Sequence, residues 1–300
     1  MDKKILVIGS NGLLGTAFRN KIKPAKRFIG DKWIFGVHKE ESKIEKDDVV
    51  FDILKPEEYC HILKDIDILI NCVGYTNVDE AEDNEMNYML NEYAVLALAE
   101  RCKENNVYLI HFSTDYIYDG ENNKGDFDDY TIYEPVNEYG KAKLNGEIAI
   151  KESGCDYLIM RVSWLYAEYG KNFVNTIYEL LKKNVPQIKV VSNIMSSLTN
   201  VYSVVDKIRY FIESDSYLRN KCKTVQYHSN YVTTPYRLAL RLKKSLVNCT
   251  TTIIPVLSEE YGFKAKRPKT TVMDLTSFHN NFYYETDTVN IESFLIRKQL

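Results

Sequence analysis

Short runs of consecutive apolar residues alternate along this chain with longer segments in which apolar residues recur every three or four positions. Short uninterrupted runs are typical of parallel strands buried on both faces, and the longer segments are typical of amphipathic helices. A long amphipathic helix is predicted over 85–103, and strands are predicted at residues 3–8, 33–37, 67–71, 107–112 and 156–162. Because helical segments with short links separate them, the pattern predicts an α/β fold with a doubly wound parallel sheet, the Rossmann architecture.

The first predicted strand runs directly into a glycine-rich segment that reads GSNGLLG, with a helical pattern after it. Strand, glycine turn and helix in this order are typical of a dinucleotide-binding site. The first glycine allows a tight turn, the second lets the backbone approach a pyrophosphate, and the third lets helix and strand pack closely. The alternative is a plain glycine turn in a βα unit. Cofactor contacts are predicted from Gly9, Asn11, Gly12, Leu13, Leu14 and Gly15.

The end of the second strand bears on which dinucleotide is bound. The acidic residue expected there to hold the adenosine ribose is missing, and His38 and Lys39 take its place. A basic residue can pair with a 2′-phosphate, so the sequence favours NADPH over NADH, with a plain surface lysine as the alternative. Ligands of an open parallel sheet bind beyond the carboxyl ends of its strands. Further cofactor contacts are therefore expected from Asp52, Ile53, Cys72, Val73, Gly74 and Tyr75.

A Tyr-x-x-x-Lys pair, Tyr139 and Lys143, is the candidate catalytic element. On a helix this spacing places both side chains on one face. We expect the lysine ammonium to lower the tyrosine pKa toward neutrality, so that the phenol can protonate a carbonyl oxygen while hydride reaches the carbon. Ser113 and Thr114, which follow the fourth strand, can supply a further hydrogen bond to that oxygen. The alternative is a solvated helix face.

Composition excludes several other classes of protein. The 300 residues carry a net charge of −3 without a long basic run, which argues against a nucleic-acid binder. No apolar run is long enough to span a membrane, and the first residues read as a strand rather than a signal peptide. The six cysteines lie far apart and the five histidines lack metal-ligand spacing. We therefore expect a cytoplasmic protein with free thiols and no metal.

The pattern becomes less regular past about residue 165. Helices are expected over 172–183, 204–212, 235–247 and 291–297, with a strand at 188–191 and a basic loop at 264–274. Residues 1–165 are therefore predicted to form the NAD(P)-binding Rossmann domain. Residues 166–300 are predicted to form mostly a smaller substrate-binding region, with some elements returning to the Rossmann sheet.

With these motifs in hand, the chain resembles the dTDP-4-dehydrorhamnose reductase group of the extended short-chain dehydrogenase/reductase superfamily. The shared motifs stand in family order over most of the chain. They are the glycine segment, NCVGYTNVDEAE at 71–82, Ser113-Thr114-Asp115-Tyr116 with Asp119-Gly120, the segment from Pro135 to Glu147, Arg161-x-Ser163-Trp164-x-Tyr166, Asn172-Phe173 and Arg267-Pro268.

The resemblance implies roles for individual residues. Tyr139 would be the proton donor, Lys143 would position the nicotinamide ribose, and Thr114 would bind the C4 carbonyl. Ser113 would contact the cofactor. Substrate contacts are implied for Asp115, Tyr116, Trp164, Asn172 and Arg267, with Arg267 gripping the nucleotide phosphates. For Trp164 a place in the core is the alternative, and for Arg267 a surface or capping role.

Two departures from the group affect the interpretation. Residues 192–199 read SNIMSSLT where the group has Asp-Gln-x-Gly-x-Pro-Thr. The substrate loop is therefore expected to differ from that of the group. Ala17 stands where some members have a magnesium-binding glutamate, so no metal is expected. Asp115 stands where bifunctional epimerase/reductases of the group carry an acid/base cysteine, which favours a pure 4-reductase.

The implied activity is NADPH-dependent reduction of the C4 ketone of a dTDP- or UDP-bound 4-keto-6-deoxyhexose, as in rhamnose biosynthesis; NADH is the alternative cofactor. A bifunctional 3-epimerase or 3,5-epimerase/4-reductase is a second reading, in which Cys72, Lys171 or Asp115 would act as acid/base. A third is a non-catalytic NADP-binding regulatory subunit, similar to the β subunit of methionine adenosyltransferase. The partner expected is the nucleotide sugar, with no nucleic acid and no membrane, and a homodimer is possible by resemblance.

Overall fold

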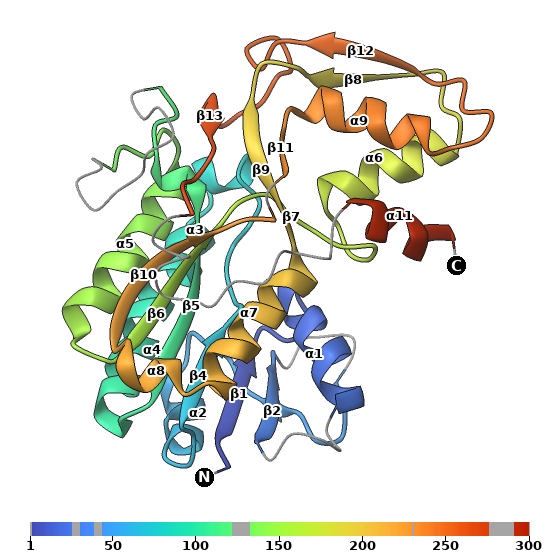
Figure 1. Cartoon of the computed structure of the whole chain (residues 1–300). Helices are drawn as coiled ribbons and strands as arrows, with labels where there is room; N and C mark the ends of the chain where they lie inside the picture. The colour runs from blue at the N-terminus through green and yellow to red at the C-terminus, as the bar shows by residue number, and fades with distance from the viewer. Residues whose placement is uncertain are drawn as a thin grey trace.

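A seven-stranded, all-parallel sheet forms the centre of the computed structural model, which describes residues 2–25, 31–38, 44–121, 133–229, 231–275 and 291–299 (Figure 1). The strand order is β10-β6-β5-β4-β1-β2-β3. The strands are β1 (Lys4–Ile8), β2 (Lys32–Val37), β3 (Val49–Val50), β4 (Ile68–Asn71), β5 (Tyr108–Thr114), β6 (Tyr157–Val162) and β10 (Cys222–Tyr227). Chain order reverses between β1 and β4, so the sheet is doubly wound, as predicted.

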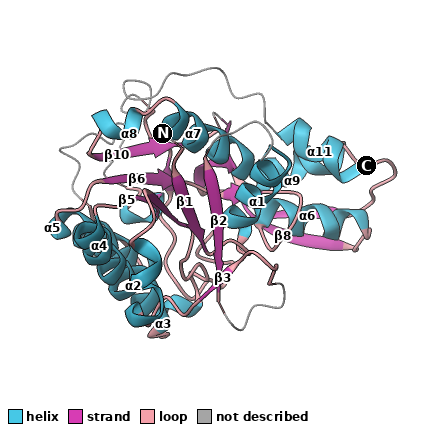
Figure 2. Cartoon of the chain, turned by 90° about the horizontal axis from the view of Figure 1, so that it is seen from below, coloured by secondary structure: helices cyan, strands magenta, loops and turns pink. Residues whose placement is uncertain are grey.

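Helices cover both faces of this sheet (Figure 2). Side chains of β1 alternate between the two faces, because successive residues of a strand point in opposite directions. Ile5 and Val7 join the cluster under α1 (Leu13–Ala25) and α7 (Val201–Glu213). Leu6 and Ile8 join the cluster under α2 (Pro56–Leu63), α4 (Ala94–Asn105) and α5 (Glu138–Ser153). Both faces are therefore apolar, which explains the uninterrupted apolar runs.

A smaller unit of strands and helices lies beyond one end of the large sheet (Figure 1). The strand β9 (Met195–Asn200) pairs with β7 (Leu165–Tyr166), β11 (Tyr231–Thr233) and β13 (Thr270–Thr271). A separate parallel pair joins β8 (Gln187–Val191) to β12 (Thr252–Val256). Side chains from the helices α6 (Phe173–Lys182), α9 (Pro235–Lys244) and α11 (Ile291–Gln299) enclose its core.

The five predicted strands of the N-terminal half are confirmed as β1, β2, β4, β5 and β6. The edge strand β10 was not predicted, because its sequence CKTVQY is apolar only in part and its first three residues are not buried. The helix expected at 85–103 is divided into α3 (Met86–Tyr88), the π-helical segment η2 (Met89–Tyr93) and α4. The short helices η1 (Glu80–Glu82), η3 (Asp115–Ile117) and α8 (Ser216–Arg219) complete the described elements. Within these described ranges, no helix is long and apolar enough to cross a membrane.

Candidate active site

A pocket of about 580 Å³ lies at the carboxyl ends of the central strands, between the large sheet and the smaller unit. Its walls come from the turns after β1 and β4, the end of β5, the helix α5 and residues of β8, β9 and β13. The switch point of an open α/β sheet is where such folds bind ligands. The predicted catalytic residues Thr114, Tyr139 and Lys143 all line this pocket.

The glycine turn has a shape that side chains would prevent. Gly9 has a φ of +69°, and a Cβ atom there would lie 2.8 Å from the backbone of Cys72 and Val73. A Cβ on Gly15 would lie 2.2 Å from the carbonyl oxygen of Gly9. The turn beside Cys72 and Val73 therefore requires Gly9, and the close packing of the helix on the turn requires Gly15. Gly12, Leu13 and Leu14 line the pocket at the N-terminus of α1, whereas the described residues Gly9, Asn11 and Gly15 shape the turn without lining it.

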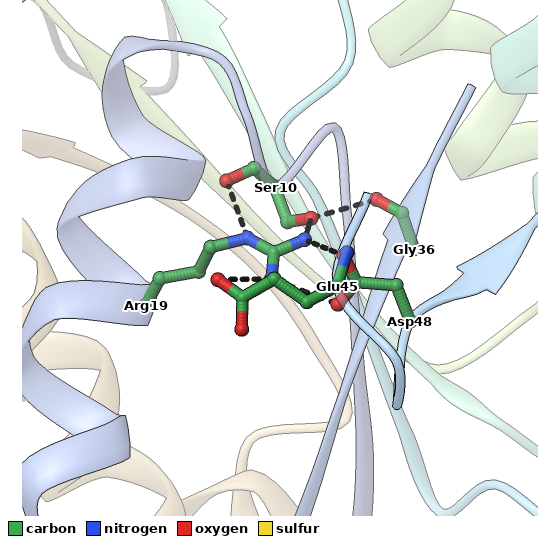
Figure 3. Close-up of polar contacts among 5 residues, drawn as sticks. All are labelled: Ser10, Arg19, Gly36, Glu45 and Asp48. Atoms are coloured by element: carbon green, nitrogen blue, oxygen red, sulfur yellow. Dashed lines mark hydrogen bonds and ion pairs between the residues drawn. The ribbon is translucent and has the colours of Figure 1, made fainter. Parts of the chain in front are cut away.

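A buried arginine ties this turn to the end of β2 and the loop before β3 (Figure 3). Arg19 donates from Nε to the carbonyl oxygen of Ser10 at 3.1 Å. Its two terminal nitrogens donate to Asp48 at 2.8 and 2.9 Å. The hydroxyl of Ser10 in turn donates to the carbonyl oxygen of Gly36 at 2.9 Å. Nothing in the sequence pattern pointed to this network.

The predicted adenosine-side residues lie apart from this lining. Among the described residues, His38, Asp52 and Ile53 do not line the pocket, and Ile53 is a core residue. His38 Nε2 is 3.9 Å from Asp52 Oδ1, and that oxygen also accepts a hydrogen bond from the Leu54 amide. Lys39 lies outside the described residues.

The turn after β4 forms one pocket wall, and the predicted cofactor contacts Cys72, Val73, Gly74 and Tyr75 belong to its lining. Its conformation depends on Asn91, a residue that sequence reasoning missed. The Asn91 side chain accepts from the Tyr75 amide at 3.1 Å and donates to the Tyr75 carbonyl at 2.9 Å. Asn91 lies in the π-helical segment η2, and irregular helical turns of this kind are frequent at functional sites.

Tyr139 stands in the first turn of α5. Asn137 is the N-cap of this helix, and its side chain accepts a hydrogen bond from the Gly140 amide at 2.8 Å. Burial raises the pKa of Tyr139 to about 12, with a further contribution from the negative charge of Asp115 that a hydrogen bond with Thr114 partly offsets. The expectation that Lys143 lowers the Tyr139 pKa toward neutrality is therefore wrong. The phenol is protonated at neutral pH, which is the state that a proton donor requires.

The Lys143 side chain extends from α5 toward the sheet. Its Nζ atom lies 2.7 Å from the carbonyl oxygen of Phe112 and 3.3 Å from Nε2 of His111. Burial lowers the pKa of Lys143 to about 8, against the opposing effect of the Glu147 carboxylate. The buried His111 also contacts Asn71 on the neighbouring strand β4. These contacts explain why Lys143 does not act on Tyr139 as expected.

Asp115 is a buried residue of the pocket lining, and hydroxyl groups surround it. It accepts hydrogen bonds from Ser163 at 2.5 Å, Ser196 at 3.2 Å and Thr114 at 3.2 Å. Ser196 also contacts Thr271 at 2.9 Å. Burial raises the pKa of Asp115, and hydrogen bonds from the surrounding hydroxyls oppose that effect. Ser196 comes from the segment 192–199 that departs from the family pattern.

The remaining predicted substrate residues, Tyr116, Trp164, Asn172 and Arg267, also line the pocket. Trp164 has a φ of +42°, rare for a bulky residue, and its ring centroid lies 5.1 Å from that of Phe173. Trp164 is partly buried: it lines the pocket and also packs against the core of the smaller unit. Asn172 caps α6 by accepting from the Asn175 amide at 2.9 Å.

Arg267 is held in the pocket wall by its neighbours. Its guanidinium lies 4.5 Å from the Phe263 ring centroid and forms an ion pair of 3.0 Å with Asp79. The Tyr261 and Phe263 rings stack with centroids 4.6 Å apart, and both line the pocket with Lys189. Sequence reasoning missed these three residues, because the loop before Arg267 shows no periodicity and Lys189 lies in an ordinary strand pattern.

The doubly wound sheet, the glycine turn and the convergence of Thr114, Tyr139 and Lys143 define a member of the extended short-chain dehydrogenase/reductase superfamily. Within it, a family model described as "RmlD substrate binding domain" matches residues 3–292. The chain therefore belongs to that family.

Individual relatives agree with this assignment. A dTDP-4-dehydrorhamnose reductase of Shigella flexneri is 28% identical over 290 residues, which cover 93% of this chain and 91% of that protein. The reductase of the same name from Burkholderia thailandensis is 32% identical over 207 residues, covering 68% of this chain and 63% of that protein. The chain thus spans under two thirds of the latter relative's length.

Solved structures share the fold over the whole chain. The dTDP-4-dehydrorhamnose reductase of Bacillus anthracis, in complex with NADP, has a TM-score of 0.80 at 24% identity, covering 100% of this chain and 99% of that chain. The orthologue from Clostridium acetobutylicum has a TM-score of 0.82 at 24% identity, covering 99% of this chain and 100% of that one. At this identity the likeness supports the Rossmann-type fold alone.

Proposed function

We propose that this protein reduces the C4 ketone of a nucleotide-bound 4-keto-6-deoxyhexose with NADPH, as a dTDP-4-dehydrorhamnose reductase does. The observation that carries the proposal is the convergence of Thr114, Tyr139 and Lys143 in the lining of one pocket, and the raised pKa of the Tyr139 phenol agrees with a proton donor. The names of the family relatives support the choice of substrate, and the NADP complex of the Bacillus anthracis relative supports NADPH.

The residues present fit a dinucleotide. A pyrophosphate requires close backbone approach at a helix N-terminus, and Gly12 and Leu13 line the pocket at the start of α1. The Cys72–Tyr75 turn would border the bound cofactor, and the Lys143 side chain would reach its ribose. When bound, the nicotinamide would supply the hydride.

The chain's own residues would prepare the ketone for that hydride. The Thr114 hydroxyl, which donates to Asp115 in this structure, would turn its hydrogen to the carbonyl oxygen, and Tyr139 would donate to the same oxygen, so that both polarise it. Tyr139 would then transfer its phenolic proton to this oxygen as negative charge develops there. Trp164 and Phe173 would cover the sugar and exclude water, and Arg267 would hold the nucleotide phosphates.

Of the three acid/base candidates for the bifunctional epimerase reading, Lys171 lines the pocket, whereas the surroundings of Cys72 and Asp115 disfavour that role. Burial raises the pKa of the Cys72 thiol, which disfavours the thiolate needed for proton abstraction. The carboxylate of Asp115 is already occupied by hydroxyl donors. The cytoplasmic location and the homodimer remain predictions of the proposed function.

The test is to incubate the protein with NADPH and a panel of dTDP- and UDP-linked 4-keto-6-deoxyhexoses, following NADPH absorbance and then product NMR. We expect oxidation of NADPH only with a keto sugar, and product reduced at C4. Solvent deuterium at C3 or C5 of the product would instead identify an epimerase. Binding of NADPH with no turnover of any sugar would overturn the proposal and favour the regulatory-subunit alternative.

A further inference from the structure

His111 is a buried histidine to which the proposed mechanism assigns no role. It pairs with Asn71 across β5 and β4, and its Nδ1 atom lies 3.1 Å from Asn71 Nδ2. Its Nε2 atom lies 3.3 Å from Lys143 Nζ. His111 and Asn71 are at most 1% exposed, and Lys143 is 5% exposed. The polar atoms of His111 and Asn71 must therefore find protein partners, whereas Lys143 also lines the pocket.

The positions of the hydrogens follow from one backbone group. The Val73 amide donates to Asn71 Oδ1 at 2.9 Å, and an N–H can only donate, so the Asn71 atom facing Val73 is the oxygen. The Asn71 NH₂ group therefore faces His111 Nδ1, which must accept. A neutral imidazole that accepts at Nδ1 carries its hydrogen on Nε2. Burial and the adjacent Lys143 lower the His111 pKa well below its ordinary value, so the ring is neutral.

The Nε2–H group of His111 thus faces Lys143 Nζ. An ammonium has no lone pair to accept this hydrogen, whereas a neutral amine has one. The Phe112 carbonyl accepts from either form of Lys143, and the Glu147 carboxylate, itself paired with Arg161 from β6, favours the ammonium. His111 therefore stabilises Lys143 as a neutral amine, and Glu147 stabilises Lys143 as an ammonium.

We propose that His111, held in its Nε2–H form by Asn71, is a positioning residue that accommodates Lys143 as a neutral amine during turnover. The inference rests on the proposed reductase function. Tyr139 gives its proton to the carbonyl oxygen as the hydride of NADPH forms the new C–H bond. Water in the pocket that both residues line relays a proton from the Lys143 ammonium to the Tyr139 phenolate, and the resulting amine accepts the hydrogen bond from His111 Nε2–H. Water restores the ammonium before the next cycle.

The first test reads the tautomer directly and needs no turnover. In ¹⁵N-histidine-labelled full-length protein, NMR distinguishes protonated from unprotonated ring nitrogens, and the His111→Gln variant assigns the His111 signals. We expect the proton on Nε2 in the native protein. In the Asn71→Asp variant the new carboxylate can only accept a hydrogen bond from His111, so the ring proton of His111 should move to Nδ1. A native protein with the proton on Nδ1 would overturn the inference, even if the protein proves not to be a reductase.

The second test is the pH profile of kcat. In His111→Gln the side-chain oxygen can turn toward Lys143 and accept from the ammonium, which should move the basic limb upward by about one pH unit, a usual effect of changing a close partner. Ile110→Val, on the same strand and equally buried, is the matched control and should leave the midpoint in place. A His111→Gln profile that is lowered at every pH without a shifted midpoint would mean that His111 has only a structural role.

Discussion

Arg19 and Asp48 form a buried bidentate ion pair, in which Arg19 Nη1 lies 2.8 Å from Asp48 Oδ1 and Arg19 Nη2 lies 2.9 Å from Asp48 Oδ2 (Figure 3). Their side chains are 7% and 3% exposed. Arg19→Met would leave the Asp48 carboxylate without this charge partner, and we expect the free energy of unfolding to fall by about 3–5 kcal/mol, as when one partner of a buried pair is removed. Urea denaturation measures the change.

Two controls accompany that variant. Adding Asp48→Leu to Arg19→Met also removes the buried Asp48 carboxylate, so the double variant should recover part of the lost free energy of unfolding. Arg209→Met breaks an exposed pair with Glu213 on α7 and should change stability little. If Arg19→Met unfolds at the same urea concentration as the native protein, the pair does not hold the glycine turn.

Tyr139→Phe removes the proposed proton donor and keeps the ring. We expect kcat to fall by about 10²–10⁴-fold, the usual contribution of acid catalysis, with NADPH affinity little changed. Stopped-flow kinetics and fluorescence titration with NADPH measure the two quantities. Tyr118→Phe, which alters a buried tyrosine outside the pocket lining, is the control. Near-native turnover by Tyr139→Phe would remove Tyr139 from the mechanism.

The rate of reduction should depend on the protonation of Lys143. Its pKa is lowered to about 8, whereas that of Tyr139 is raised to about 12, so Tyr139 stays protonated while Lys143 titrates. If the ammonium supports catalysis, kcat is highest below about pH 8 and falls as pH rises through that value. A profile of kcat that stays flat from pH 7 to about pH 9.5 would contradict this role.

The free energy of unfolding should also depend on the protonation of Lys143, but it should rise with pH where kcat falls. The folded pKa of Lys143, about 8, lies below its ordinary value of 10.5, so between these values the unfolded chain binds more protons than the folded one. The Lys143 contribution to the free energy of unfolding therefore increases with pH across this window. Lys143→Met should lack this increase, and it should also weaken both NADPH binding and catalysis. Denaturation at several pH values, compared with native protein, provides the measurement.

Trp164→Ala tests whether the Trp164 ring covers the bound sugar. We expect KM for the keto sugar to rise about tenfold or more, because a large aromatic in a binding site commonly contributes over 1 kcal/mol. NADPH affinity should not change, and Trp164→Phe should keep most of the effect of the ring. Since Trp164 has a φ of +42°, Trp164→Gly should be more stable than Trp164→Ala with the same KM. A different KM for these two variants would implicate the backbone rather than the ring.

Much of the fold could be predicted because its cause is local. The strands β1, β4 and β5 are buried on both faces, so most of their residues are apolar and the runs are visible in the sequence. The edge strand β10 and the short strand β3 lack this double burial, and β10 was missed. The division of the expected 85–103 helix at Asn91 depends on contacts with the turn at Tyr75, which no periodicity encodes.

The sequence alone determined the doubly wound sheet, the glycine turn and the residue types that meet at the pocket, because apolar periodicity and motif spacing are properties of neighbouring positions. Only the tertiary structure decided their electrostatics. The Lys143 side chain contacts Phe112 and His111, and the Tyr139 pKa rises instead of falling. Asp115 accepts hydrogen bonds from hydroxyl groups of separate segments of the chain. Burial and the partners of a charge depend on segments far apart in the chain, and packing alone brings those segments together.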